Sequence, residues 1–356
     1  MTQAGTCAVT RTAGETATQA VRRARRIPRR RQRVVVSGLA GLLLLAFAAR
    51  VLLGDFTITI PDFFHILTGT DIPGATYILM ESKLPRAVLA VLVGTAFGTG
   101  GAIFQTILRN PLASPDVIGV SAGASAAAVV AIVILGLGGP AVSLAAVAGA
   151  VGVSVLVRSV AGKAGKAGGY RLVVVGVCTA AALQSVIQYV FTRADEYDAQ
   201  VVLRWLTGSV SSAAWPTIAV LAVLLVLLLP TAGWLGRGMR ALELGEDTAA
   251  GLGVPGSRSD LLLVVAVVLT ACGVAAAGPV AFVAFLAGPI ARALNAGRTT
   301  LPGAALTGAT IVVAADYVAD YLLADINFPV GVVTGALGAP FLLWLLASGR
   351  TGRRAQ

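Results

Sequence analysis

Apolar segments long enough to cross a lipid bilayer dominate this sequence of 356 residues. A helix needs about 20 consecutive apolar residues to span the hydrocarbon core. Hydropathy and turn residues predict ten spans, at residues 34–53, 85–108, 117–136, 141–157, 172–191, 214–233, 261–276, 280–295, 303–324 and 330–347. Only 12% of the residues are charged, about half the fraction found in soluble domains. The sequence therefore predicts an all-α polytopic membrane protein and excludes a soluble enzyme.

The distribution of basic residues predicts how these spans are oriented. Residues 1–33 are predicted to be a basic, disordered cytoplasmic tail, and residues 349–356 a short C-terminal tail. With the N-terminus inside, only five of the 27 Lys and Arg residues fall outside: Arg50, Lys83, Arg86, Arg193 and Arg204. Loops rich in Lys and Arg stay in the cytoplasm, so both termini are expected there. No aromatic residue interleaves the arginines of the tail, which favours membrane lipid over nucleic acid as its partner.

No catalytic or nucleotide-binding motif is complete in this chain. Residues 119–123 have the G-x-S-x-G spacing of a hydrolase nucleophile, but their flanks are apolar helix and the single histidine, His65, is in another segment. Packing of small residues is the favoured interpretation. Residues 162–166 lack the full phosphate-loop pattern, so the sequence encodes no ATP-binding site. If this chain takes part in ATP-driven transport, the ATPase is a separate chain. The three cysteines are far apart, which predicts neither a disulfide nor a metal site.

Two polar regions have open interpretations. The segment 234–260 predicts two short helices separated by glycine, which form either a solvated connector or a surface that inserts into a partner. On the outer side, Lys83 and Arg86 either reach lipid phosphates or pair with carboxylates of a soluble partner. Asp316 and Asp320 are four residues apart and share one helix face. Hydration from outside is expected to account for both acids.

Several motifs occur in a characteristic order. They are Leu84-Pro85-Arg86, Gly101 with Gln105, Arg109-Asn110-Pro111-Leu112-Ala113, Gly119-Val120-Ser121, Trp205-Leu206-Thr207-Gly208-Ser209, Leu244-Gly245, Leu252-Gly253-Val254, Ala277-Gly278-Pro279, Ile290-Ala291-Arg292 and Pro329-Val330-Gly331. Over residues 34–348 this pattern resembles the permease subunits of ATP-binding-cassette (ABC) importers for iron-siderophore complexes, haem and cobalamin, the FecCD family of type II importers. The last motif, continuing to Trp344, is most similar to ferric-enterobactin-type permeases.

The resemblance implies a fold of two related halves, spans two to five and seven to ten. These halves are five spans apart, an odd number, so they are inverted in the membrane. It also implies a second permease subunit, two ABC ATPase subunits and an extracytoplasmic substrate-binding protein. ATP and Mg would be bound by the ATPases, and iron would travel inside its chelator. No cofactor or metal site is therefore expected in this chain.

The resemblance also assigns roles to residues. Lys83 and Arg86 match a cationic pair that docks the binding protein. The residues matching the coupling helices that contact the ATPases are Leu242, Leu244, Gly245, Glu246, Asp247, Ala249, Leu252 and Gly253. Residues of the structural motifs are Arg109, Asn110, Pro111, Gly278, Pro279, Pro329 and Gly331. The translocation pathway is expected along the fifth span, at Gln184, Ser185 and Gln188.

Three positions depart from the family pattern. Lys83 replaces the usual arginine. Lysine keeps the positive charge but lacks the planar guanidinium group, which can form two hydrogen bonds to one carboxylate. Asp320 stands where many members have an arginine near the outer end of the ninth span. Gly288-Pro289 stands where the family usually has Pro-His, so the break in the helix is kept but shifted by one residue.

We therefore predict a multi-pass protein of the cytoplasmic membrane, the permease subunit of an ABC importer for an iron-siderophore complex of the ferric-enterobactin type. It is not expected to be an enzyme itself. Within the family, a permease for haem or cobalamin is the alternative. Outside it, the alternative is a secondary transporter driven by an ion gradient.

Overall fold

The computed structural model describes residues 17–162, 168–322 and 327–347, and these ranges contain helices and no strands. Seven helical stretches are long and apolar enough to cross a membrane, and three apolar helices are shorter. The ten helices are α1 (Ala17–Leu52), α4 (Leu84–Ile107), α5 (Val120–Val133), α6 (Pro140–Ala161), α7 (Gly168–Phe191), α9 (Trp215–Leu235), α12 (Gly256–Ala277), α13 (Val283–Leu294), α14 (Leu301–Tyr321) and α15 (Val330–Ala347). Each matches one predicted span, so the predicted fold class is confirmed.

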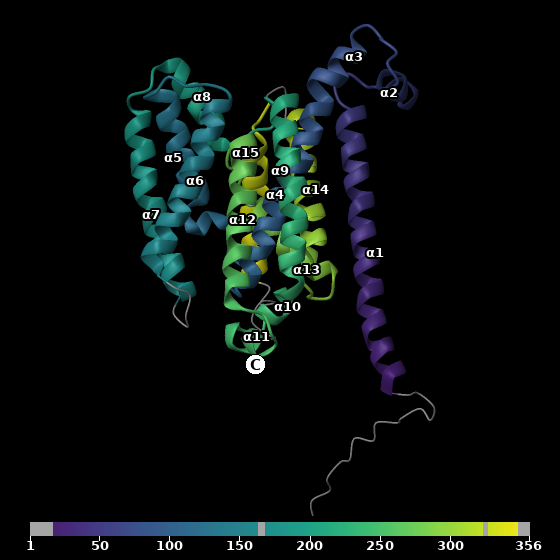
Figure 1. The fold of residues 1–356 in the computed structure, drawn as a ribbon. Helices are drawn as coiled ribbons and strands as arrows, with labels where there is room; N and C mark the ends of the chain where they lie inside the picture. Colours follow the sequence, from purple (N-terminus) through teal and green to yellow (C-terminus); the bar gives the residue numbers. More distant parts are fainter. Residues whose placement is uncertain (1–16, 163–167, 323–326, 348–356) are drawn as a thin grey trace, which may run out of the picture.

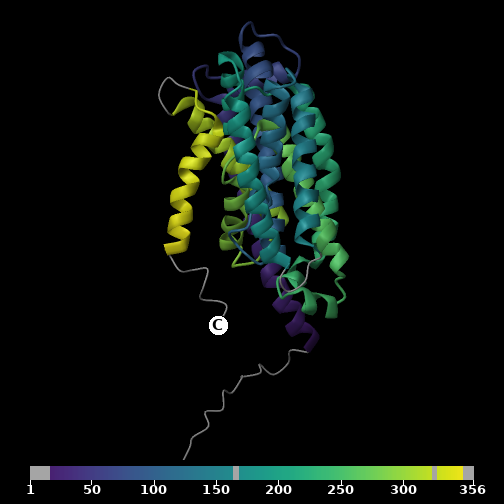
Figure 2. The ribbon, with the colours of Figure 1, turned by 90° about the vertical axis from the view of Figure 1, so that its left-hand side faces the viewer.

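The helices form a bundle with their axes roughly parallel (Figure 1). Helices α5, α6 and α7 form one side, α4, α9, α12, α13 and α14 the centre, and α1 the opposite side, where it packs against α14. Turned by 90°, the bundle shows α15 along one edge (Figure 2). Two short helices, α10 (Met239–Leu242) and α11 (Glu246–Gly251), lie together at the lower end of Figure 1. We call this end the inner end and the opposite end the outer end.

Helix α4 is the most enclosed of the long spans, because 78% of its most apolar window is buried. Its glycines permit close contact with α14. A Cβ atom at Gly94 would overlap the carbonyl oxygen of Gly308, and one at Gly98 would overlap that of Ala304. Small residues let helix backbones approach closely in membranes. The glycine-rich sequence of α4 thus makes it the centre of the bundle.

Helices α5 and α13 are too short to cross a bilayer alone. With 14 and 12 residues, they extend for about 21 and 18 Å, less than the ~30 Å hydrocarbon core. The 3₁₀ helix η2 (Pro115–Ile118) precedes α5, and the non-helical residues 278–282 precede α13. The chain leaves both segments at a positive φ, 81° at Gly119 and 63° at Phe282. Broken backbone persists at membrane depth only beside protein or a water-filled cavity.

The two interrupted helices occupy corresponding places in the two halves. In chain order α5 is the second span of the half α4–α7, and α13 is the second span of the half α12–α15. The single span α9 separates these halves, so corresponding helices are five spans apart and run in opposite directions. The predicted inverted repeat thus gives each half one interrupted helix at the same position in its order.

The structure differs from the sequence prediction at the N-terminus and at the outer end. Helix α1 begins at Ala17, so residues 17–33 continue the first span instead of forming a disordered tail. Arginine, glutamine and alanine favour helix, which accounts for the difference. Residues 1–16 and 349–356 lie outside the described residues. At the outer end, α2 (Ile60–Leu67), α3 (Ala75–Tyr77), the π-helix η1 (Ile78–Lys83) and α8 (Glu196–Thr207) were not predicted.

Three of the sequence motifs meet in one backbone junction at the outer end. The amide of Ser209 donates to the carbonyl of Ala277 at 2.7 Å, and the amide of Gly331 donates to that of Gly208 at 3.1 Å. Gly208 and Gly278 have positive φ angles of 73° and 72°. Cβ atoms at Gly208, Gly278 and Gly331 would overlap neighbouring backbone. The glycines of these motifs are therefore needed for close approach, and Pro279 and Pro329 lie beside them.

We expect Gly331→Ala to destabilise the protein, because its Cβ would overlap the carbonyl oxygen of Thr207. Overpacking of this kind costs about 1–3 kcal/mol. Gly335→Ala, on the same helix, is the matched control, since its Cβ would meet its nearest neighbour at 4.0 Å. Unfolding of both variants by a denaturing detergent measures the difference. Equal stability of the two variants would contradict the proposed close packing at this junction.

Candidate functional site

A cavity of about 580 Å³ lies between the beginnings of α5 and α13. Its walls come from the first half (η2, α5 and α7), from the second half (residues 279–282 and α13) and from α8. The lining residues are Ser114, Asp116, Ser121, Ala122, Ser125, Gln184, Ile187, Leu206, Pro279, Val280, Ala281, Phe282 and Phe285. Interrupted helices in corresponding positions of two inverted halves are the usual place of the substrate pathway in transporters. The geometry therefore makes this cavity the candidate pathway.

The two halves give the cavity walls of different chemistry. The side built by η2 and α5 is polar, with three serines and Asp116. The hydroxyl of Ser121 donates a hydrogen bond to the Asp116 carboxylate. The side built by residues 278–282 and α13 is apolar, and the rings of Phe282 and Phe285 meet edge to face with centroids 6.3 Å apart. A ligand in this cavity would contact hydroxyl and carboxylate groups on one side and aromatic surface on the other.

One of the three residues predicted to line the pathway lies on the cavity wall. Gln184 of α7 is a lining residue. Ser185 and Gln188 are exposed on the same helix but lie outside the cavity lining. The hydroxyl of Ser185 donates back to the carbonyl of Ala181 at 3.3 Å, as small polar residues in helices often do. The pathway role of Ser185 and Gln188 stays a prediction.

Sequence reasoning missed the polar wall. The predicted span began at residue 117, one position after Asp116, so the carboxylate was assigned to the preceding loop. An acid at membrane depth is a functional candidate by default, and its position beside Pro115 in an apolar region was the available signal. Packing of small residues, the interpretation favoured for 119–123, holds at Gly123, where a Cβ would overlap the backbone of Gly149.

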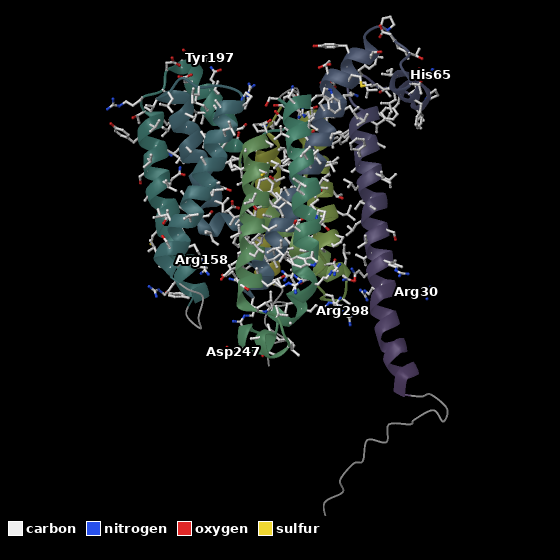
Figure 3. The ribbon with its side chains drawn as sticks, in the orientation of Figure 1. Arg30, His65, Arg158, Tyr197, Asp247 and Arg298 are labelled. Atoms are coloured by element: carbon white, nitrogen blue, oxygen red, sulfur yellow. The ribbon has the colours of Figure 1, made fainter. Side chains whose placement is uncertain are left out.

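At the inner end, α10 and α11 display two leucines to the surroundings. Leu244 is 65% exposed and Leu252 is 63% exposed, whereas Leu242 and Ala249 are buried with Val254. Figure 3 shows Asp247 at the lower tip of this region. The segment thus has a small apolar core of its own and an outward apolar surface. Two short helices were predicted here, and the structure has them.

The segment of α10 and α11 contacts the ends of two membrane helices. Gly245, at φ 110°, lies close to the guanidinium of Arg109, since a Cβ there would be 3.3 Å from an Nη atom. The carboxylate of Glu243 accepts a hydrogen bond from the hydroxyl of Thr299 at 2.7 Å. The Asn110 side chain accepts from the amide of Leu112 at 2.9 Å and forms the turn after α4. Movement of this segment would therefore reach both α4 and the loop before α14.

The Gly288-Pro289 sequence has a local explanation. Gln105 of α4 accepts a hydrogen bond from Arg292 at 2.8 Å and donates one to the carbonyl of Phe285 at 3.0 Å. A Cβ atom at Gly288 would overlap the side-chain oxygen of Gln105. Glycine at this position therefore leaves room for a buried amide that links α4 to α13.

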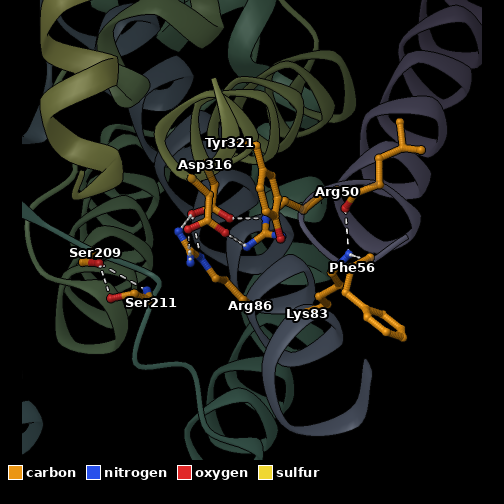
Figure 4. A network of polar contacts seen from close by, with 10 residues as sticks. Arg50, Phe56, Lys83, Arg86, Ser209, Ser211, Asp316 and Tyr321 are labelled. Atoms are coloured by element: carbon orange, nitrogen blue, oxygen red, sulfur yellow. Dashed lines mark hydrogen bonds and ion pairs between the residues drawn. The ribbon is translucent and has the colours of Figure 1, made fainter. Parts of the chain in front are cut away.

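Near the outer end, two arginines and two aspartates form a buried network (Figure 4). Asp316, with 0% of its side chain exposed, pairs with Arg50 at 2.6 Å and Arg86 at 2.8 Å. Asp320 pairs with the same two arginines at 2.9 and 2.8 Å. Arg50 also donates to the hydroxyl of Tyr321 at 3.0 Å. Since the charges balance, the network ties α1 and α4 to α14 without leaving a net charge.

This network corrects the sequence-based account of the outer acids. Asp316 was expected to be hydrated from outside, but it is fully buried because α1 brings Arg50 to it. Lys83 is only 4% exposed, and its ammonium donates to the carbonyl oxygens of Leu53 and Phe56. Direct docking of a partner by Lys83 or Arg86 would require these internal bonds to break. Their docking role stays a prediction.

Interrupted helices of two inverted halves around one cavity are typical of membrane transporters, and comparisons with known proteins agree. Residues 26–348 match the FecCD transport family. The ferric enterobactin transport system permease protein FepG of Escherichia coli (strain K12) is 39% identical over 82% of this chain and 89% of its own length. The Fe(3+) dicitrate transport system permease protein FecD of the same strain is 38% identical over 76% of this chain and 85% of its own length.

A more distant relative and a solved structure extend the comparison. The vitamin B12 import system permease protein BtuC of Citrobacter koseri is 32% identical over 88% of this chain and 94% of its own length. A metal-chelate type ABC transporter solved in an inward-facing conformation has the same fold, with a TM-score of 0.76 and 24% identity over 89% of this chain and 99% of that chain. This chain belongs to the FecCD transport family, and its place is in the cytoplasmic membrane.

We expect Asp316→Asn to lower the free energy of unfolding by about 3–5 kcal/mol, because it leaves buried Arg50 and Arg86 short of a charged partner. Asp71→Asn, at an exposed position of the outer loop, should change it by less than about 0.5 kcal/mol. Titration with a denaturing detergent measures both. A loss in Asp316→Asn no larger than that in the control would show that the network does not stabilise the bundle.

Proposed function

We propose that this chain is the permease subunit of an ABC importer that carries an iron chelate into the cytoplasm. The observation that carries the proposal is the cavity between α5 and α13, which lies above an inner segment with exposed Leu244 and Leu252. Membership of the FecCD family supports the class of transporter. Relatives described as permeases for ferric enterobactin and Fe(3+) dicitrate support an iron chelate as cargo.

The energy for transport would come from partner ATPases bound at the inner end. Two leucines exposed beside α10 and α11 suit a groove on another protein, since exposed apolar groups in an otherwise polar region mark contact sites. The residues proposed for this contact are Leu242, Leu244, Gly245, Glu246, Asp247, Ala249, Leu252 and Gly253. Contacts of this segment with Arg109 and Thr299 would transmit the motion of the ATPases to α4 and α14. Two ATPases and a second permease subunit complete the proposed assembly.

We propose that the inner end faces the cytoplasm. Arg30, Arg158 and Arg298 all lie towards this end (Figure 3), as the positive-inside rule expects of cytoplasmic segments. The described start of α1 and the described end of α15 are at the same end (Figure 2), which supports cytoplasmic termini. Anionic lipid would interact with the basic start of α1. The binding protein would then dock at the outer end, near α2, α3 and α8.

The exact chelate stays a prediction. Matching relatives are described for ferric enterobactin, Fe(3+) dicitrate, achromobactin and vitamin B12, so enterobactin-type specificity and the haem or cobalamin alternative await a direct test. Iron is proposed to move inside its chelator. The described part of the chain contains no group of three or more His, Cys, Asp or Glu residues that could hold a metal ion.

Reconstitution separates the proposal from an ion-driven secondary transporter. We expect proteoliposomes with the permease, its ATPases and its binding protein to accumulate ferric chelate only when ATP is present on the ATPase side. The matched control contains an ATPase variant that binds ATP but does not hydrolyse it. Accumulation driven by an ion gradient in the permease alone would establish the alternative mechanism.

We expect the double substitution Leu244→Glu and Leu252→Glu to abolish ATP-dependent uptake, because two carboxylates would be desolvated in an apolar groove. Both side chains are exposed, so membrane insertion and folding should be retained. Methionine at both positions keeps the apolar surface and should keep uptake. Uptake and co-purification of the ATPases are measured for both variants. Normal uptake by the glutamate variant would remove the coupling role of these leucines.

A further inference from the structure

The carboxylate of Asp116 is the one charged group among the lining residues of the cavity. It is exposed there and accepts a hydrogen bond from Ser121. Asp116 is not the N-cap residue of α5, because Gly119 has that position and no side chain caps the helix. Helix capping therefore does not account for the acid. Its carboxylate belongs to the wall of the cavity instead.

The positive ends of two helices lie at the same cavity. Ser121 and Ala122 belong to the first turn of α5, Phe285 belongs to the first turn of α13, and all three line the wall. A helix N-terminus carries roughly half a positive charge and binds anions readily. The first turn of α13 contains no acidic residue. Without Asp116, the cavity would combine two positive helix ends with aromatic and hydroxyl surface.

We propose that Asp116 is a fixed counter-anion in the translocation pathway, which offsets the N-terminal ends of α5 and α13 and so prevents an anionic chelate from being held there. The magnitudes support this role, because one unit of negative charge balances two helix ends of about half a charge each. The proposal rests on the cavity being the pathway of the proposed importer. It adds that an anionic chelate would pass through the cavity because it is bound there only weakly.

Chemical modification of an engineered cysteine measures the electrostatic potential in the cavity directly, without any chelate. Ala281 is exposed on the wall contributed by the second half, so Ala281→Cys places a thiol inside the cavity. The background replaces Cys7, Cys178 and Cys272 by alanine in the complete importer. The probes are two methanethiosulfonate reagents of similar size, one with a trimethylammonium group and one with a sulfonate group. The measured quantity is the ratio of their rate constants, cation over anion.

We expect Asp116→Asn to lower this ratio at Ala281→Cys by about fivefold, because removing one charge from the same hydrated cavity changes the two rate constants in opposite directions by about twofold each. Asp116→Glu keeps the charge and should leave the ratio within about twofold. Thr70→Cys, on the exposed loop between α2 and α3 far from α5 (Figure 1), should show the same ratio in every background. Asp116→Ser is a second neutral variant, should the asparagine variant fail to assemble.

Two results would overturn the proposal. One is an equal ratio in the Asp116 protein and its neutral variants, which would mean that the carboxylate does not set the potential. The other is the absence of reaction with both reagents at Ala281→Cys, which would mean that the cavity holds no water. Neither result depends on uptake, so a failure here is distinguishable from a failure of the importer function, which ATP-dependent accumulation tests.

Discussion

Backbone amides and carbonyls that leave a helix inside a bilayer have no water to bind, and this constraint determines where the chain can be interrupted. The interruptions before α5 and α13 both occur beside the central cavity. At the outer end, the loops after α8, after α12 and before α15 bond to one another through Ser209, Ala277, Gly208 and Gly331. Their glycines are needed because the paired backbones leave no space for Cβ atoms. The break before α13 thus begins at a junction whose backbone groups are paired, because Ser209 donates to the last residue of α12, Ala277.

The two ends of the bundle differ in a way that suits a protein driven from one side. At the outer end, the network of Arg50, Arg86, Asp316 and Asp320 ties three helices together with balanced charge. At the inner end, the segment of α10 and α11 contacts the membrane helices through a few residues and leaves large apolar side chains exposed. Force applied by a partner at the inner end would therefore act on the less constrained part of the bundle.

The inverted halves share a fold but not a chemistry. Helix α5 and its preceding turn contribute hydroxyls and Asp116 to the cavity, whereas α13 and its preceding segment contribute aromatic rings. Gly288, which leaves room for Gln105, shows a similar local adjustment, because the hydrogen bond that Arg292 donates to Gln105 links α13 to α4 near the inner end. A cavity built this way offers a ligand polar surface on one side and aromatic surface on the other.

The sequence by itself determined the ten spans, the two inner helices and the family, because hydropathy and motif order are local properties that a bilayer turns directly into structure. Of the three residues predicted for the pathway, Gln184 lies on the wall of the cavity. Only the tertiary structure showed that Asp116 faces the cavity, and that Arg50 meets Asp316, 266 positions away along the chain. No periodicity encodes such a pairing, since it depends on how helices distant in sequence pack. The partners of Lys83 and Arg86 were missed for the same reason: a charge count places a residue on one side of the membrane but does not identify which neighbour neutralises it.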